Sequence, residues 1–125
     1  MRLWHIDLLP LLDSKRICSQ WRECVALIGN GFGKKHKTVD YVFKYSDKRL
    51  MKYASQVYDE MINRGYKPNI ECIYNALIRR YRCDYDTAKE LYLNCYNEKN
   101  YVEHDDKYME ECLNNLLNKG IKIEI

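Results

Sequence analysis

Residues 13–29, DSKRICSQWRECVALIG, decide the fold of this 125-residue chain. Apolar side chains recur every three or four positions along this stretch, which is the spacing of one face of an α-helix. Asp13-Ser14 is suited to cap the helix at its start, and Gly29 is suited to stop it. Gln20 and Glu23 are expected among the residues that cover the other faces. The apolar face consists of Ile17, Trp21, Cys24, Val25 and Ile28.

Four more segments carry helical periodicity with a capping or stopping residue at a boundary. They run from Ser46 to Arg64-Gly65, from Pro68 through Ile78, from Asp84 to Cys95, and from near Asp105 to Lys119 before Gly120. Two short stretches alternate instead, at residues 39–43 and 121–125, and a short extended piece is an alternative there. We therefore predict an all-α fold: a compact single domain over residues 1–125, with about five helices and little or no strand.

The amino-acid composition indicates a globular protein without a membrane-spanning segment. Hydrophobic residues make up 46% of the chain and charged residues 31%, which is the balance of a globular protein rather than a disordered one. No apolar run approaches the roughly 20 residues that cross a bilayer. The first seven residues, MRLWHID, carry a histidine and an acid where a signal peptide needs an apolar stretch. We expect a cytoplasmic protein without membrane contact.

Charge is unevenly distributed along the chain. Residues 1–67 hold 13 Lys and Arg against 7 Asp and Glu, whereas residues 68–125 hold 8 against 11. A basic half beside an acidic half indicates either an anionic partner on one face or an ordinary solvated surface.

No motif predicts a metal or cofactor site. The six cysteines form no Cys-x-x-Cys pair, and their positions on or beside apolar stripes favour small buried side chains in a reducing compartment. Glu103, His104, Asp105 and Asp106 cluster where a helix begins, and helix starts favour acidic residues without any metal. Gly29, Gly31 and Gly33 lack the preceding strand of a phosphate-binding loop. We expect no cofactor.

Glu23 is a single carboxylate among basic residues. Arg16 and Arg22 share its predicted helix, and Lys34, Lys35 and Lys37 follow soon after. Nearby positive charge favours the ionised form of a carboxyl group, so we expect a lowered pKa for Glu23. An ordinary surface ion-pair set is the alternative interpretation.

Several short motifs together resemble a known family. They are the opening Met-Arg-Leu-Trp-His, the run Gln20-Trp21-Arg22-Glu23, Gly-Asn-Gly at 29–31, Lys-Lys-His at 34–36, Tyr-Val-Phe at 41–43, and Met-Ile-Asn-Arg-Gly-Tyr at 61–66. In this order and spacing they resemble the pyrimidine-dimer DNA glycosylases, the phage-type endonuclease V family. The likeness covers residues 1–68, and the helical part from 68 to 125 is unmatched. The aromatic tail of the phage enzyme has no counterpart in the final residues here.

The resemblance implies a mostly helical fold and a specific chemistry. In the family the nucleophile is the α-amine of the first residue, which forms an imine with the sugar C1′ of a damaged nucleotide before β-elimination cuts the strand. Here that amine belongs to Met1, because the bulky Arg2 disfavours removal of the initiator methionine. Glu23 matches the family's catalytic carboxylate. The resemblance thus implies a DNA glycosylase with AP lyase activity on pyrimidine-dimer or abasic sites.

The same resemblance implies a monomer that binds damaged double-stranded DNA. Arg2 and Arg22 match family positions near the DNA, and the basic family residue three places after the catalytic glutamate is Ala26 here. From charge alone, we add phosphate contacts at Arg16, Lys34, Lys35 and Lys37. His5 and His36 are candidates for acid/base roles, or for structural histidines. A DNA-binding member without catalysis and a helical protein-interaction module are the alternative functions.

Overall fold

The computed structural model describes residues 2–30, 40–45 and 47–123. In this part of the chain, five α-helices and three short 3-10 helices occur and no strand is present, which confirms the predicted all-α fold. The α-helices are α1 (Ser14–Asn30), α2 (Asp47–Asn63), α3 (Glu71–Tyr81), α4 (Tyr85–Leu93) and α5 (Asp106–Asn118). The 3-10 helices are η1 (Ile6–Leu11), η3 (Asp40–Lys44) and η4 (Asn94–Asn97).

The apolar stripe of α1 lies in the core as its spacing predicts. Ile17, Cys24 and Ile28 are fully buried and Trp21 is 6% exposed, whereas Val25 is half-buried at the edge. Gln20 departs from the prediction because it is only 1% exposed. It stands three residues after Ile17 and four before Cys24, so it shares the buried face.

Two glycines end α2 and α5 in the same way. Gly65 has φ +87° and Gly120 has φ +82°, a left-handed conformation that costs glycine no steric penalty. The next residue then donates its N–H to a carbonyl five positions back, from Tyr66 to Met61 and from Ile121 to Leu116, each at 2.9 Å. These are Schellman motifs, and they confirm both predicted helix ends.

Two aspartates begin helices as predicted. Asp84 accepts the Thr87 N–H at 2.8 Å, and Asp105 accepts the Tyr108 N–H at 2.9 Å. The acidic cluster before α5 is therefore explained in part by helix capping. Glu103 accepts a hydrogen bond from Tyr45 at 2.9 Å. No group of three or more His, Cys, Asp or Glu in the described ranges could hold a metal ion.

The alternating stretches are not strands where the structure describes them. Residues Asp40–Lys44 form η3, which buries Val42 and turns Tyr41 onto Tyr101 at 5.1 Å between ring centroids. Residues 121–123 follow the turn at the end of α5 without regular secondary structure, and Ile121 and Ile123 pack on the core. Strand geometry needs a pairing partner, and neither stretch has one among the described residues.

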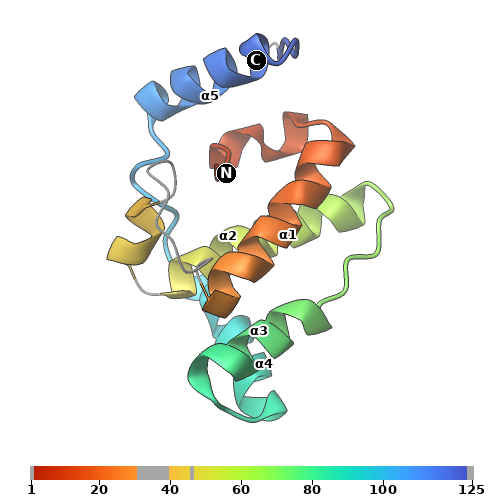
Figure 1. Cartoon of the computed structure of the whole chain (residues 1–125), viewed down its shortest axis with the longest axis vertical. Helices are drawn as coiled ribbons and strands as arrows, with labels where there is room; N and C mark the ends of the chain where they lie inside the picture. The colour runs from red at the N-terminus through yellow and green to blue at the C-terminus, as the bar shows by residue number, and fades with distance from the viewer. Residues whose placement is uncertain (1, 31–39, 46, 124–125) are drawn as a thin grey trace.

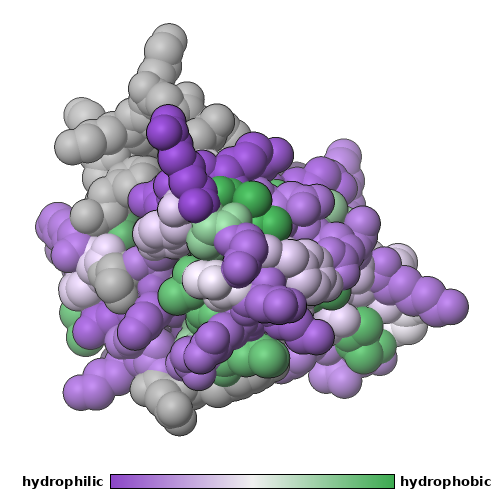
Figure 2. Space-filling view, turned by 90° about the horizontal axis from the view of Figure 1, so that it is seen from below, coloured by the Kyte–Doolittle hydropathy of each residue, from purple (hydrophilic) through white to green (hydrophobic). Residues whose placement is uncertain are grey.

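Figure 1 shows how the described helices are arranged. Helix α1 packs on α2 and α3, and α4 packs on α3 at the lower end of the view. Residues 2–5 run between α1 and α5 at the upper end. The face seen from below is mostly hydrophilic with separate apolar patches (Figure 2). None of the described helices has the length and hydrophobicity needed to cross a membrane.

Candidate functional site

Gln20 joins the start of the chain to Glu23. Its amide oxygen accepts hydrogen bonds from the Trp4 N–H at 2.8 Å and the Tyr53 hydroxyl at 2.9 Å. Its amide nitrogen donates to the Arg2 carbonyl at 3.1 Å and to Glu23 Oε2 at 2.8 Å. All four hydrogen-bonding positions of this buried amide are thus used. Residues 2–4 are thereby held against α1, next to the Glu23 carboxylate.

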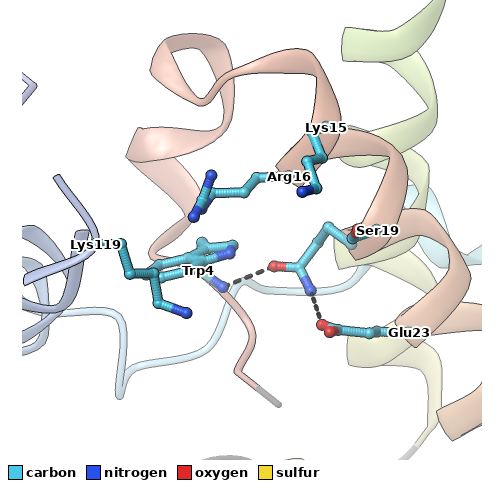
Figure 3. A pocket seen from close by; sticks show the side chains of 7 residues that line it. Trp4, Lys15, Arg16, Ser19, Glu23 and Lys119 are labelled. Atoms are coloured by element: carbon cyan, nitrogen blue, oxygen red, sulfur yellow. Dashed lines mark hydrogen bonds between the residues drawn. The ribbon is translucent and has the colours of Figure 1, made fainter. Parts of the chain in front are cut away.

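Glu23 opens onto a cavity of about 200 Å³ at the surface of α1. Helix geometry places Glu23 on the same face as Gln20 and Ser19, because residues three and four apart are neighbours. Lys119 enters from the end of α5, and Trp4 lies beside it (Figure 3). The lining residues are Trp4, Lys15, Arg16, Ser19, Gln20, Glu23 and Lys119.

The cavity concentrates positive charge around one carboxylate. Lys15, Arg16 and Lys119 contribute three cationic side chains, and Glu23 contributes the single acid. Figure 3 shows Lys15, Arg16 and Lys119 arranged on the sides of the cavity opposite and above Glu23. Such a site favours an anionic ligand that presents its reacting atoms to the carboxylate.

The pKa of Glu23 moves opposite to the sequence expectation. Burial raises it above its ordinary value, and this effect outweighs the hydrogen bond from Gln20 and the positive charges of Arg22 and Lys119. The prediction of a lowered pKa was wrong because it counted neighbouring charges and omitted desolvation. A carboxylate with a raised pKa is a stronger proton acceptor, which suits a general base.

Two arginines of α1 have side chains near this cavity. Arg16 lines it and also pairs with Asp13 at 3.2 Å, one turn earlier. Arg22 is exposed and donates to the Ser19 hydroxyl at 3.0 Å. Both guanidinium groups therefore lie within reach of a ligand that approaches the open side of α1.

Arg2 occupies a different environment. Its side chain is 12% exposed, pairs with Glu111 at 3.1 Å and lies over the Tyr108 ring at 5.7 Å. The structure thus places the guanidinium of Arg2 against α5, and Arg2 does not line the cavity.

His5 lies in a buried cluster of rings. It is 3% exposed, accepts the Asp7 N–H at 3.1 Å, and its ring lies 5.4 Å from that of His104 between centroids, tilted by 30°. His104 Nδ1 accepts the Ile6 N–H at 3.0 Å, so its Nε2 carries the proton and donates to Tyr41 at 2.6 Å. The structure places His5 among these contacts, and it is not one of the cavity's lining residues.

The His104 contacts make the fold sensitive to acid. Burial, with the neighbouring His5, lowers the pKa of His104 from 6.5 to about 4. Below pH 6.5 the imidazole of His104 is protonated in the unfolded chain, whereas in the folded chain it stays neutral down to about pH 4. The free energy of unfolding therefore falls as the pH drops through this window. We expect His104→Gln to reduce this loss by about 2–3 kcal/mol. Urea unfolding at pH 7.5 and pH 4 measures it, and equal losses in both proteins would contradict the assignment.

Several residues predicted for the site lie outside the described ranges. They are Met1, Lys34, Lys35, His36 and Lys37. Their predicted roles in catalysis, phosphate binding and acid/base chemistry therefore stay predictions.

A small helical protein with a carboxylate in a basic cavity is the class that this geometry defines. A model of the pyrimidine dimer DNA glycosylase family matches residues 1–74. The chain therefore belongs to the pyrimidine dimer DNA glycosylase family, as the sequence motifs predicted. No curated protein and no solved structure matches the chain significantly.

Five lining residues were missing from the predicted site: Trp4, Lys15, Ser19, Gln20 and Lys119. Gln20 could have been found from its helical spacing to Ile17, and Lys15 from its place one turn before Ser19. Trp4 was named only as one of several aromatic candidates. No sequence pattern around Lys119 predicts that it lines the cavity, because its proximity to Glu23 depends on how α5 packs over the start of the chain.

Proposed function

We propose that the protein is a DNA glycosylase and AP lyase that acts on damaged double-stranded DNA through the α-amine of Met1 and the carboxylate of Glu23. Family membership supports a DNA substrate. The observation that carries the chemistry is the Gln20 amide nitrogen, which hydrogen-bonds both the Arg2 carbonyl and Glu23. The α-amine is one residue away from Arg2, and consecutive Cα atoms are about 3.8 Å apart.

The α-amine suits this role because of its acidity. An α-ammonium group has a pKa near 7.7–8.0, against about 10.4 for lysine, so a substantial fraction is neutral near pH 7.5. On a damaged nucleotide, the nitrogen forms a bond to the sugar C1′ while the bond from C1′ to the base breaks. The C1′–O4′ bond then breaks, O4′ takes up a proton, and the nitrogen lone pair forms the C1′–N double bond. On an abasic aldehyde, it adds to C1′ and water leaves. Either route gives an imine between protein and DNA.

Glu23 would then act on the proton at C2′. The protonated imine acidifies this position, and a nearby carboxylate can accept the proton. The electrons of the C2′–H bond form a C1′–C2′ double bond as the π electrons of the C1′–N bond move onto the nitrogen. When these electrons return, the C1′–N double bond is restored, a C2′–C3′ double bond forms, the C3′–O bond breaks and the 3′ phosphate leaves. Glu23 also offsets the positive charge of the iminium nitrogen. Burial raises the pKa of Glu23 and so increases its basicity.

The cationic side chains would bind the DNA backbone. Arg16 lines the cavity and Arg22 donates to Ser19, which also lines it. Lys34, Lys35 and Lys37 belong to the same basic half of the sequence. Arg2 stays a candidate contact, although its guanidinium is paired with Glu111. The protein would bind the duplex as a monomer, and no cofactor is needed for imine chemistry.

Arg22 is the clearest test of backbone binding. We expect Arg22→Gln to reduce the slope of log K against log salt by about one unit, because one phosphate contact fewer releases fewer counterions. Lys89→Gln, an exposed change on α4, is the matched control and should leave the slope as it is. Fluorescence titrations of an abasic duplex at several salt concentrations measure it. An equal slope for both variants would exclude Arg22 as a phosphate contact.

Reductive trapping tests the proposed chemistry. The untagged protein is incubated with abasic duplex or cyclobutane-dimer duplex, and borohydride reduces any imine to a stable amine. A covalent protein–DNA adduct is expected with the abasic duplex. Salt-sensitive binding without an adduct would favour a DNA-binding member without catalysis, and no binding at low salt would exclude both.

A further inference from the structure

Helix α5 lies beside residues 2–5 (Figure 1), although it belongs to the part of the chain beyond the family match at residues 1–74. Three residues of α5 and the turn before it make the contacts, and we name His104, Tyr108 and Glu111 the α5 clamp. None of the three was predicted to serve the site.

The clamp holds the side chain of Arg2. Glu111 pairs with the guanidinium at 3.1 Å, and the Tyr108 ring lies under it at 5.7 Å. Because only 12% of the Arg2 side chain is exposed, this ion pair is partly shielded from solvent on one side.

The clamp also holds the backbone. The Tyr108 hydroxyl donates to the Leu3 carbonyl, and His104 Nδ1 accepts the Ile6 N–H at 3.0 Å. These contacts alternate with those of Gln20, which accepts the Trp4 N–H and donates to the Arg2 carbonyl. The segment is therefore fixed from both sides, by α1 on one and by α5 on the other.

We propose that the α5 clamp positions the N-terminal segment for attack on the DNA, with Tyr108 as its principal positioning residue. This inference rests on the proposed function, because it assigns a role in placing the α-amine. Holding a nucleophile in the correct geometry lowers the entropic part of the barrier, and a displacement of about 1 Å can cost about a hundredfold in rate. Arg2 then acts within the protein, as the side chain through which Glu111 and Tyr108 of α5 hold the N-terminal segment.

Tyr108→Phe removes the hydroxyl but keeps the ring. We expect amide hydrogen exchange in residues 3–6 to become faster, and single-turnover cleavage of abasic duplex at saturating enzyme to slow about tenfold. The dissociation constant for the duplex should change by less than about twofold, because no DNA contact is lost. Glu110→Gln, an exposed change on the same helix, is the control and should alter neither quantity.

Exchanging the charges of Arg2 and Glu111 distinguishes a role of Arg2 in the ion pair with α5 from a role in DNA binding. Arg2→Glu and Glu111→Arg should each slow cleavage, and the double variant should recover most of the rate because it restores an ion pair with opposite polarity. If Arg2 instead contacts a phosphate, the double variant stays impaired and binds DNA more weakly, which would overturn the proposal for this pair.

The outcomes are distinct. Faster exchange with slower cleavage and unchanged binding supports the clamp. Unchanged exchange in Tyr108→Phe, or faster exchange with an unchanged cleavage rate, overturns it. A wild-type protein that forms no adduct with abasic duplex would overturn the proposed function, and the exchange measurement would still report whether α5 holds residues 3–6.

Discussion

Glu23→Gln is expected to slow strand cleavage at an abasic site by a factor of about 10²–10⁴, the range that a positioned general base supplies. The amide keeps the size of the carboxylate, and its oxygen can still accept the hydrogen bond from Gln20, so the fold should be preserved. DNA binding should be equal or slightly tighter, because a negative charge leaves a basic cavity. Single-turnover cleavage and equilibrium binding measure the two effects.

The pH profile of wild-type cleavage gives a second readout for Glu23. Protonation of the α-amine already slows imine formation as the pH falls below about 8, so Glu23 is followed in the elimination step from imine formed beforehand. There, protonation of the carboxylate removes the base, and the rate declines on the acid side. Burial raises the pKa of Glu23, so the midpoint of this decline should lie above 4.5. Glu90→Gln, an exposed change on α4, should keep the wild-type rate and profile. A Glu23→Gln protein that cleaves at the wild-type rate would exclude Glu23 as the base.

Blocking the N-terminus is the second change with a large expected effect. An acetylated amine cannot form an imine, because its lone pair is delocalised into the amide and no second proton remains to be lost. We expect the adduct with abasic duplex to fall to background, at least about a hundredfold below wild type. Binding should persist, because the cationic side chains of α1 are unchanged.

A terminal extension controls for added bulk. The same short peptide added at the C-terminal end should leave trapping at the wild-type level, whereas at the N-terminal end it should impair trapping as acetylation does. Equal trapping by the acetylated and free proteins would show that the α-amine is not the nucleophile.

Local signals in the sequence were sufficient to predict much of the fold. Capping by Asp84 and Asp105 and the glycines at 65 and 120 depend on backbone geometry within a few residues, so the helix boundaries follow from short motifs. The alternation at residues 39–43 left an extended piece open as an alternative to helix, because a period of two describes a strand only where a neighbouring strand is available to pair with it.

The site was predictable only in part. Glu23 and Arg22 follow from a short motif, but the desolvation of Glu23 depends on the chain that folds over it. The buried position of Gln20 was visible in its spacing, yet its four hydrogen bonds join three segments distant in sequence. Lys119 and the α5 clamp depend wholly on tertiary packing, which no local pattern encodes.

The identity of the trapped amine tests the central claim most directly. Three amines are candidates for the nucleophile: the α-amine of Met1, which adjoins Arg2 in the sequence, and the side chains of Lys15 and Lys119, which line the cavity with Glu23. The borohydride-reduced adduct with abasic duplex is digested, and the modified peptide is sequenced by mass spectrometry. The account predicts modification at the α-nitrogen of Met1, and modification at Lys15 or Lys119 instead would contradict it.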